Sequence, residues 1–532
     1  MFRNKSVMAH NFSMIPSSHV PRSSFRALKG YRTTFDAGYL IPITVLEVYP
    51  GDSFNLKLTA ICRLATPIFP VMDNLFLDSF FFFVPNRLVW DNFQKCMGEQ
   101  LNPGDSISYV IPQMVSPVGC YAALSLQDYM GLGTVGQIDA AGTISHSTLP
   151  LRAYNLIYRE WFRDQNLQDS PVVDKDDGPD SPSDYILRRR GKRHDYFTSC
   201  LPWPQKGDAV SIPLGTSAPI KWGPNTGSGG TAADNQFAGF QVSGSGVTSN
   251  AYSATYGGAQ TSPTPNSSRY NMYADLTSAS AATVNVLRLS IATQELLERF
   301  ARGGTRYVEI NRAHFGVVSP DARLQRPEYL GGGSTPINFT PVAQTSVTST
   351  TPQGNLSAFS LGVMHGHGFS KSFVEHGFVI GLVSVRADLS YQQGIDRFWF
   401  RSTRYDFYWP AFAHLGEQAV LMREIYVKGT AQDTTVFGYQ EAWAELRYQR
   451  SMITGLFRST YATPLDAWHL SQKFTTAPTL GNTFIQETPP VDRVVAVGSG
   501  ANGQQFIFDS VADITMARPL PMYSVPGFGA RL

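Results

Sequence analysis

The segment His365-Gly366-His367-Gly368 carries two imidazoles at a spacing that suits a shared metal ion. In a strand, residues two apart point to the same face, so both rings can reach one ion, and Glu375 and His376 follow shortly after. Glycine beside each histidine is, however, more typical of a tight or flexible turn. The structural reading of this segment is therefore favoured over the metal reading, and we expect no cofactor.

An acidic run followed at once by a basic run is the second polar feature. The acidic residues are Asp174, Asp176, Asp177, Asp180 and Asp184, and the basic run is Arg188-Arg189-Arg190-Gly191-Lys192-Arg193-His194. So many carboxylates can bind Ca²⁺, but the D-x-D-x-D-G loop with its distal Glu is absent. We expect a solvated or intersubunit cluster of salt bridges.

Catalytic signatures are missing from the sequence. It contains no G-x-x-x-x-G-K-[ST], G-x-S-x-G, H-E-x-x-H or C-x-x-C motif. The glycines of Gly331-Gly332-Gly333-Ser334 are not followed by the helix that a phosphate-binding loop requires. The sequence thus predicts a protein that is not an enzyme, with no catalytic and no metal-binding residues.

The N-terminal segment is basic. Residues 1–35 contain no Asp or Glu, and their basic residues are Arg3, Lys5, Arg22, Arg26, Lys29 and Arg32. Such a segment can neutralise phosphates before it folds, which is typical of arms that bind nucleic acid. A solvated, unordered terminus explains the same composition equally well.

Most of the secondary structure predicted from the sequence is β-strand, and these strands must position the polar and basic residues described above. Residues 54–64 alternate apolar and polar side chains, and residues 75–84 are apolar on both faces apart from Asp78 and Ser79. Further strands are predicted near residues 307–318, 378–385 and 505–514. Because these strands are far apart and not joined by regular helices, we expect an antiparallel sandwich.

Two helices interrupt this pattern. One begins at Pro150 and carries Leu151, Tyr154, Tyr158 and Trp161 at helical spacing. The other begins near Val284, has a stripe of Leu289, Ala292, Leu296 and Phe300, and ends at Gly303-Gly304. We expect both stripes to contact the core.

The composition points to a chain that associates. Charged residues make up 16% of the 532 residues and aromatic residues 12%, whereas an ordinary globular chain has roughly 25% charged residues. A surface so poor in charge is a liability for a lone soluble monomer, so much of it should be buried against other subunits.

One long segment is an insertion. From Ala209 to Ser268 the only charged residues are Lys221 and Asp234, and Gly, Ser, Thr, Ala and Asn dominate. A loop of this length is functional or disordered in most compact domains. Its aromatic residues, which would allow a small β-rich knob, are Trp222, Phe237, Phe240, Tyr252 and Tyr256.

Targeting and redox signals are weak. The first residues develop no apolar signal region, and no apolar run reaches the length of a membrane span, so we expect no membrane insertion. The cysteines Cys62, Cys96, Cys120 and Cys200 are too sparse for a disulfide framework, which suits a reducing cytoplasm.

Many separate blocks, in the right order, resemble the major capsid proteins (VP1) of the gokushoviruses, single-stranded DNA bacteriophages of the Microviridae. The blocks in the C-terminal half are Tyr391–Gly394, Asp406–Pro410, Leu415–Gln418, Phe437–Gln440, Trp443–Glu445, Ile453–Arg458, Trp468–Leu470 and Pro521–Gly527. Earlier blocks are Pro150–Asn155, Glu298–Tyr307, Arg326–Gly332 and Gln344–Ser346. The resemblance covers nearly the whole chain apart from about residues 209–283.

The resemblance implies a mainly β fold, an eight-stranded antiparallel viral jelly roll with long helix-containing loop insertions, assembled as a T=1 icosahedral shell of sixty copies around circular single-stranded DNA. The domains would be a basic N-terminal arm facing the capsid interior (1–35), a first jelly-roll part with helical insertions (36–204), a surface insertion at the threefold protrusion (205–283), and a second jelly-roll part with the C-terminal extension (284–532).

The resemblance also implies partners for each part. The six basic residues of the arm would contact packaged DNA, a task shared with a small basic DNA-binding protein, and an internal scaffolding protein would act during assembly in the bacterial cytoplasm. The insertion would contact a receptor on the bacterial surface through its five aromatic residues. The expected core or intersubunit anchors are Phe398, Trp399, Tyr405, Phe407, Tyr408, Trp409, Trp443 and Trp468, with domain core favoured for any single one.

One alternative from another class stays open. A monomeric β-sandwich that binds carbohydrate, or a glycosidase with an Asp/Glu pair, would also use many aromatic residues. The state of assembly separates the two hypotheses, because only a capsid protein forms megadalton particles.

Overall fold

The computed structural model describes residues 21–210, 220–224, 270–274, 284–318, 325–496 and 503–523. The chain divides into two compact units, Met1–Pro204 with Phe300–Leu532, and Gln205–Arg299. The second unit contains the antiparallel pair β7 (Ile220–Pro224) and β8 (Tyr270–Ala274) and most of helix α4 (Val284–Arg302).

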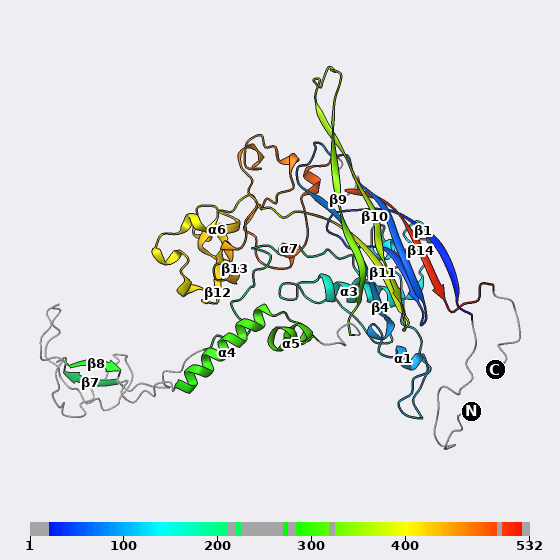
Figure 1. The fold of residues 1–532 in the computed structure, drawn as a ribbon, viewed down its shortest axis with the longest axis horizontal. Coiled ribbons are helices and arrows are strands. Elements are labelled where there is room, and N and C mark those ends of the chain that lie inside the picture. The colour runs from blue at the N-terminus through cyan, green and yellow to red at the C-terminus, as the bar shows by residue number, and fades with distance from the viewer. Residues whose placement is uncertain are drawn as a thin grey trace, which may run out of the picture. The chain divides into compact units, whose positions relative to one another are not determined.

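The first unit is built on an eight-stranded antiparallel sheet with the strand order β1-β14-β3-β10-β9-β4-β11-β2 (Figure 1). The strands are β1 (Ser23–Phe35), β2 (Ile41–Val48), β3 (Ser53–Leu64), β4 (Leu75–Pro85), β9 (Glu328–Ala343), β10 (Leu356–Ser372), β11 (Gly377–Ala387) and β14 (Phe506–Arg518). The expected fold class, a mainly β jelly roll with helix-containing insertions, is confirmed.

The two halves of this sheet pack face to face. Phe81 of β4 meets Phe369 of β10 with ring centroids 5.5 Å apart, and Phe83 meets Phe373, just beyond β10, at 4.7 Å. These rings belong to one buried cluster that includes the inward residues of β3 and β14. The β1-β14-β3-β10 half and the β9-β4-β11-β2 half therefore share one sandwich core.

The two halves differ on their outer faces. In β3 every second residue is buried and the others are exposed, as the alternating sequence predicts. In β4 and β11 nearly every residue is buried, because a second layer covers their outer face. This layer contains α3 (Leu149–Ile157), whose apolar residues pack with Phe82, Val84 and Ile380.

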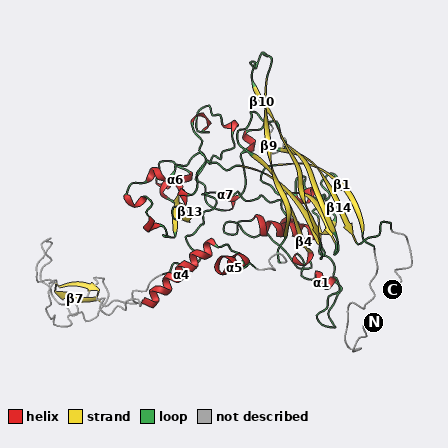
Figure 2. Cartoon of the chain, in the orientation of Figure 1, coloured by secondary structure: helices red, strands yellow, loops and turns green. Residues whose placement is uncertain are grey.

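Short elements complete the first unit, and Figure 2 shows α6 and α7 of this unit to one side of the main group of strands. They are α1 (Phe93–Cys96), β5 (Gln113–Val115), α2 (Leu126–Tyr129), β6 (Ser145–Ser147), α5 (Tyr307–Phe315), β12 (Glu417–Leu421), α6 (Met422–Ile425), β13 (Val436–Glu441) and α7 (Asn482–Ile485). A third apolar cluster joins residues of β12, α6, β13 and α7 with Phe197 and Tyr391.

Two predictions about the elements are wrong. The segment predicted as a strand near residues 307–318 is helix α5, because the Arg306 amide donates to Glu309 Oε2 at its start (3.2 Å) and Gly316 ends it at φ 69°. Among the described residues the α4 stripe is largely exposed: Leu289 is 69% and Leu296 is 44% exposed in the single chain, and Phe300 packs on His314 of α5 with ring centroids 4.5 Å apart.

Candidate functional site

The clearest surface feature is a run of aromatic side chains at residues 398–409, here called the aromatic block. It follows the long connection after β11 and is folded into short 3₁₀ turns at Arg397–Phe400 and Arg404–Asp406. Its exposed members are Phe398 (53%), Trp399 (70%), Tyr405 (60%), Phe407 (53%), Tyr408 (47%) and Trp409 (51%). The prediction that any single one of them belongs to the domain core is wrong for these six.

The backbone of the aromatic block is nevertheless held in place. Asp406 Oδ2 accepts from the amides of Ser402 (2.9 Å) and Thr403 (2.7 Å), and these bonds lower its pKa to about 2. Trp409 Nε1 donates to the carbonyl of Arg404 at 2.9 Å. The rings are thus presented to solvent on an ordered loop, which reduces the entropy lost when a partner binds.

The other two predicted anchors are half-buried. The Trp443 ring lies edge-on to Tyr408 with centroids 5.6 Å apart, and its Nε1 donates to the carbonyl of Phe412 at 3.0 Å. Trp468 stacks on Phe69 with centroids 5.1 Å apart. These two residues fasten loops within the chain.

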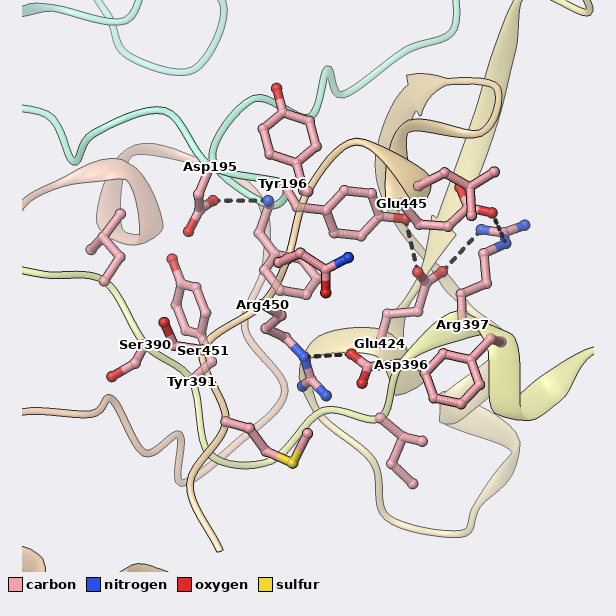
Figure 3. Close-up of a pocket in the computed structure, with 18 of the residues that line it drawn as sticks. Asp195, Tyr196, Ser390, Tyr391, Asp396, Arg397, Glu424, Glu445, Arg450 and Ser451 are labelled. Atoms are coloured by element: carbon pink, nitrogen blue, oxygen red, sulfur yellow. Dashed lines mark hydrogen bonds and ion pairs between the residues drawn. The ribbon is translucent and has the colours of Figure 1, made fainter. Parts of the chain in front are cut away.

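A cavity of about 340 Å³ lies at the base of the aromatic block (Figure 3). Its charged groups bind one another. Glu424 accepts from the Tyr196 hydroxyl (2.8 Å) and from Arg397 (3.0 Å), and Arg450 Nε donates to Asp396 at 2.9 Å. Arg397 and Asp396 directly precede Phe398, so these pairs position the start of the aromatic block.

A glycosidase would need a general acid in a cavity of this kind, and Glu424 is a candidate that lines it. Burial raises the pKa of Glu424, as a general acid requires, but the neighbouring Arg397 opposes this shift. Both oxygens of Glu424 already accept hydrogen bonds, one from Tyr196 and the other from Arg397 and the Leu421 amide. This carboxyl group is arranged for structure, and no observation here favours sugar chemistry.

The predicted DNA-contacting residues lie on a strand for the most part. Arg26, Lys29 and Arg32 belong to β1, the edge strand paired along its whole length with β14. The prediction of an arm that reaches residue 35 is therefore wrong for Ser23–Phe35, whose alternating side chains complete the sandwich. Arg3 and Lys5 lie outside the described residues.

The two arginines of β1 are already paired with acidic residues. Arg26 donates to both carboxylate oxygens of Asp513 (2.9 and 2.8 Å), and Arg32 donates to Asp509 at 3.3 Å. Arg22 donates to the hydroxyl of Ser53 at 2.5 Å, and burial lowers the pKa of Lys29. Because Asp513 and Asp509 of β14 neutralise Arg26 and Arg32, we expect β1 to bind phosphate more weakly than its basic composition suggests.

The predicted host-contact residues are mostly outside the described part of the chain. Trp222 belongs to β7, and Phe237, Phe240, Tyr252 and Tyr256 fall in the segments that are not described. The predicted insertion, residues 205–283, lies within the second compact unit, Gln205–Arg299.

Of the two histidines, only His367 packs against neighbouring strands. His367 Nδ1 lies 2.8 Å from the Ser79 hydroxyl and its Nε2 lies 3.2 Å from the Thr335 hydroxyl, while His365 is exposed. A Cβ on Gly368 would lie 1.9 Å from the Leu56 carbonyl oxygen, which explains the glycine. Within the described residues, no group of three His, Cys, Asp or Glu is placed to hold a metal.

Residues of the acidic run bind side chains in the layer that covers β4 and β11. Asp180 binds the buried Arg152 of α3 through Arg152 Nε (2.7 Å) and also accepts from the Tyr185 hydroxyl. Asp177 accepts from Trp90 Nε1 at 2.6 Å. We expected these aspartates to form a solvated or intersubunit cluster, but Asp180 forms a buried ion pair within the chain. Its partner, Arg152, lies 28 residues away, and the sequence alone does not reveal such a pairing.

The basic run has its partners elsewhere in the first unit. Arg190 donates to Asp78 of β4 at 2.5 Å, and Arg386 of β11 donates to the same Asp78 oxygen at 2.8 Å. Arg189 stacks on Tyr39, with 4.0 Å from its Cζ to the ring centroid. Asp78, an apparent interruption of an apolar strand, is therefore the centre of a buried ionic network.

Along the described ranges, no helix is both long and apolar enough to span a membrane. All four cysteines are free, and Cys62, Cys120 and Cys200 are buried.

Comparison with known proteins gives a consistent result. The family model for the capsid protein (F protein) matches residues 13–528. The capsid protein VP1 of Bdellovibrio phage phiMH2K is 47% identical over 527 residues, with 97% of each chain covered. Those of Chlamydia phage 1 and Spiroplasma virus 4 are 44% and 37% identical, with 98% and 97% of each chain covered.

Proposed function

Because the chain belongs to the phage capsid protein (F protein) family, we propose that sixty copies of it close a T=1 icosahedral shell around circular single-stranded DNA. The protein is a structural capsid protein of the virion, of the type found in the Microviridae. This role requires complementary surfaces and no catalytic group.

The observation that carries the proposal is the aromatic block. Large apolar patches are rare on soluble monomers and mark surfaces that bind partners. Aromatic residues on an ordered loop suit this role, because they bury a large area with few rotatable bonds. In a shell, copies of the same chain surround each subunit and can cover these rings.

Particle mass tests the proposal directly. The chain should be co-expressed with the internal scaffolding protein of the same phage, and the products sedimented and imaged by electron microscopy. Sixty copies of the 58.6 kDa chain amount to about 3.5 MDa. Isometric particles near this mass support the shell, whereas a folded species of a few subunits, with the scaffold present, contradicts it.

Contact with packaged DNA is proposed for the basic N-terminal residues, beside a small basic DNA-binding protein. Since Arg26 and Arg32 are paired with acidic residues on β14, we expect Arg3 and Lys5 to contribute more. The double variant Arg3→Ala/Lys5→Ala should release DNA from particles at lower salt than the control Arg26→Ala. Equal release from the two variants would contradict this assignment.

Host attachment is proposed for the insertion, residues 205–283. Its low charge and many small residues are typical of surface loops, which can vary without loss of the scaffold. Deletion of Ala209–Ser268 should leave particle formation intact and abolish adsorption to host cells. A deletion variant that adsorbs normally would place the receptor contact elsewhere.

A further inference from the structure

The β9–β10 hairpin continues beyond the sandwich as a two-stranded ribbon, residues 338–361 (Figure 1). β9 pairs with β4 only as far as Ile337, and β10 pairs with β3 only from Gly362 onward. Between these points, Asn338–Ala343 pairs with Leu356–Leu361 alone. This ribbon is the feature from which we draw the inference.

The ribbon has an ordered tip, and its inward face packs on the sandwich: Phe339 contacts the core cluster, and Ser360 Oγ accepts from the Leu64 amide at 2.8 Å. The Gln344 amide donates to the Asn355 carbonyl at 2.8 Å, and the Gly354 amide donates to the Gln344 carbonyl at 2.8 Å. An isolated two-stranded hairpin is only marginally stable in water, and a third strand or a packed face is normally needed. The inward face of the ribbon supplies this packing, whereas its outward face has no such cover within the described residues.

The ribbon lacks charge. None of residues 329–370 is Asp, Glu, Lys or Arg. Exposed edges and faces of sheets usually carry charged residues or proline that discourage pairing with other chains. Pro341 removes one donor from β9, but the β10 part of the ribbon, Leu356–Leu361, has neither proline nor charge.

The outward face of the ribbon is apolar and continues onto the sheet. Phe359 is 48%, Leu361 is 39% and Val363 is 38% exposed, whereas the alternate residues on β10 are buried. Val363 lies opposite Ile61 of β3, which is 46% exposed. An apolar strip thus runs from the ribbon to the outer face of the sandwich.

We propose that this strip docks on a second copy of the chain, so that the β9–β10 ribbon is an assembly contact separate from the aromatic block. The choice of partner follows from charge. Nucleic acid would need cations and a basic protein would need carboxylates, and the ribbon offers neither. The chain itself is poor in charge and exposes aromatic surface, so a neighbouring copy supplies a complementary face.

The inference rests on the proposed shell, and the test uses particles of the full chain. A photo-crosslinking amino acid, p-benzoylphenylalanine, is placed at Phe359, and irradiated particles are analysed by denaturing gel and mass spectrometry. The matched control places it at Phe369 of β10, which is 7% exposed. We expect the probe at 359 to give a covalent dimer of this chain and the control to crosslink only within one chain.

A pair of substitutions measures the contribution of the contact. Phe359→Lys should lower particle yield by at least about tenfold, which is the effect of removing an interface anchor. Phe359→Tyr, which keeps an aromatic ring at this position, should give the particle yield of the parent chain. The free Phe359→Lys subunit should unfold at the same midpoint as the parent chain, because the side chain is half exposed.

The outcomes are distinguishable. Particles from the parent chain, together with either normal assembly of Phe359→Lys or a crosslink to a different protein, would overturn the ribbon inference and leave the shell intact. If the parent chain forms no particles with its scaffold present, the proposed shell fails and the inference fails with it.

Discussion

Two aromatic-rich segments of this chain have similar composition and opposite environments. In β4, Phe81, Phe82 and Phe83 are 0%, 1% and 6% exposed. In the aromatic block, Phe398 and Trp399 are 53% and 70% exposed. The difference shows that aromatic content alone does not separate the core of a subunit from its contact surface.

What separates the two segments is the number of layers around them. β4 has the opposite half of the sandwich on one side and the α3 layer on the other, so successive side chains are buried in alternate directions. The aromatic block lies on short turns over polar pairs such as Arg397 with Glu424. Its rings have no second layer within the described chain, and a neighbouring subunit can supply one.

The largest effect on subunit stability is expected from a substitution in the buried strand β4. Phe81→Ala should destabilise the free subunit by about 3–5 kcal/mol, because it removes a fully buried ring and leaves a cavity. Chemical denaturation of the soluble subunit measures this loss. A change below about 1 kcal/mol would show that β4 does not lie in a close-packed core.

The layer that covers β4 depends on a buried ion pair. Asp180→Asn should cost about 3 kcal/mol in unfolding free energy, because it leaves Arg152, whose side chain is 0% exposed, with only the exposed carboxylate of Asp176 as a charged partner. The control Asp184→Asn changes a neighbouring carboxyl group that is exposed to an intermediate degree. Equal stability of the two variants would contradict a role for the pair in holding the covering layer.

Acid should weaken the same layer. Burial alone would raise the pKa of Asp180, but hydrogen bonds from Arg152 and Tyr185 lower it below its ordinary value of 3.8. A carboxyl group with a lowered folded-state pKa contributes stability above 3.8 and loses it as pH falls through the lowered value. Asp78, held by Arg190 and Arg386, acts in the same direction.

Unfolding midpoints measured across this acidic range test the linkage. The parent chain should lose stability below pH 3.8 more steeply than Asp180→Asn does. Glu424 opposes this trend, because burial raises its pKa above 4.5, and the comparison with the variant cancels its contribution. Parallel pH curves for the two chains would refute the assignment.

The smallest effect on subunit stability is expected in the aromatic block. Trp399→Ser should change the unfolding free energy by no more than about 0.5 kcal/mol, as is usual for exposed positions. Particle yield should nevertheless fall sharply, because the lost ring is an interface anchor. A destabilised subunit would instead show that Trp399 packs within its own chain.

Much of the sandwich could be predicted from sequence because burial leaves a local pattern. The alternation in residues 54–64 predicts β3, and the apolar run that begins at Leu75 predicts β4 with both faces covered. The edge strand β1 was hidden by its charges, although Phe25, Ala27 and Tyr31 alternate with exposed residues. In helix α5, Val308 and Ile310 alternate with Glu309 and Asn311, so the same local pattern predicts a strand where the structure has a helix.

The candidate site was less predictable, because its environment depends on parts of the chain that are far apart in sequence. The exposure of the aromatic block follows from the absence of a covering layer, which no local pattern records. The pairs of Arg26 with Asp513 and of Arg386 with Asp78 join residues separated by 487 and 308 positions. Sequence identified these residue types correctly but did not reveal their partners.

Hydroxyl-radical footprinting of the aromatic block, in free subunits and in assembled particles, tests the central claim most directly. Mass spectrometry of peptides spanning residues 397–412 reports the labelling of Trp399, Tyr405 and Trp409. The account predicts strong labelling in the free subunit, where these rings are 70%, 60% and 51% exposed, and strong protection in the particle. Equal labelling in both states would contradict the assignment of this surface to contacts between subunits.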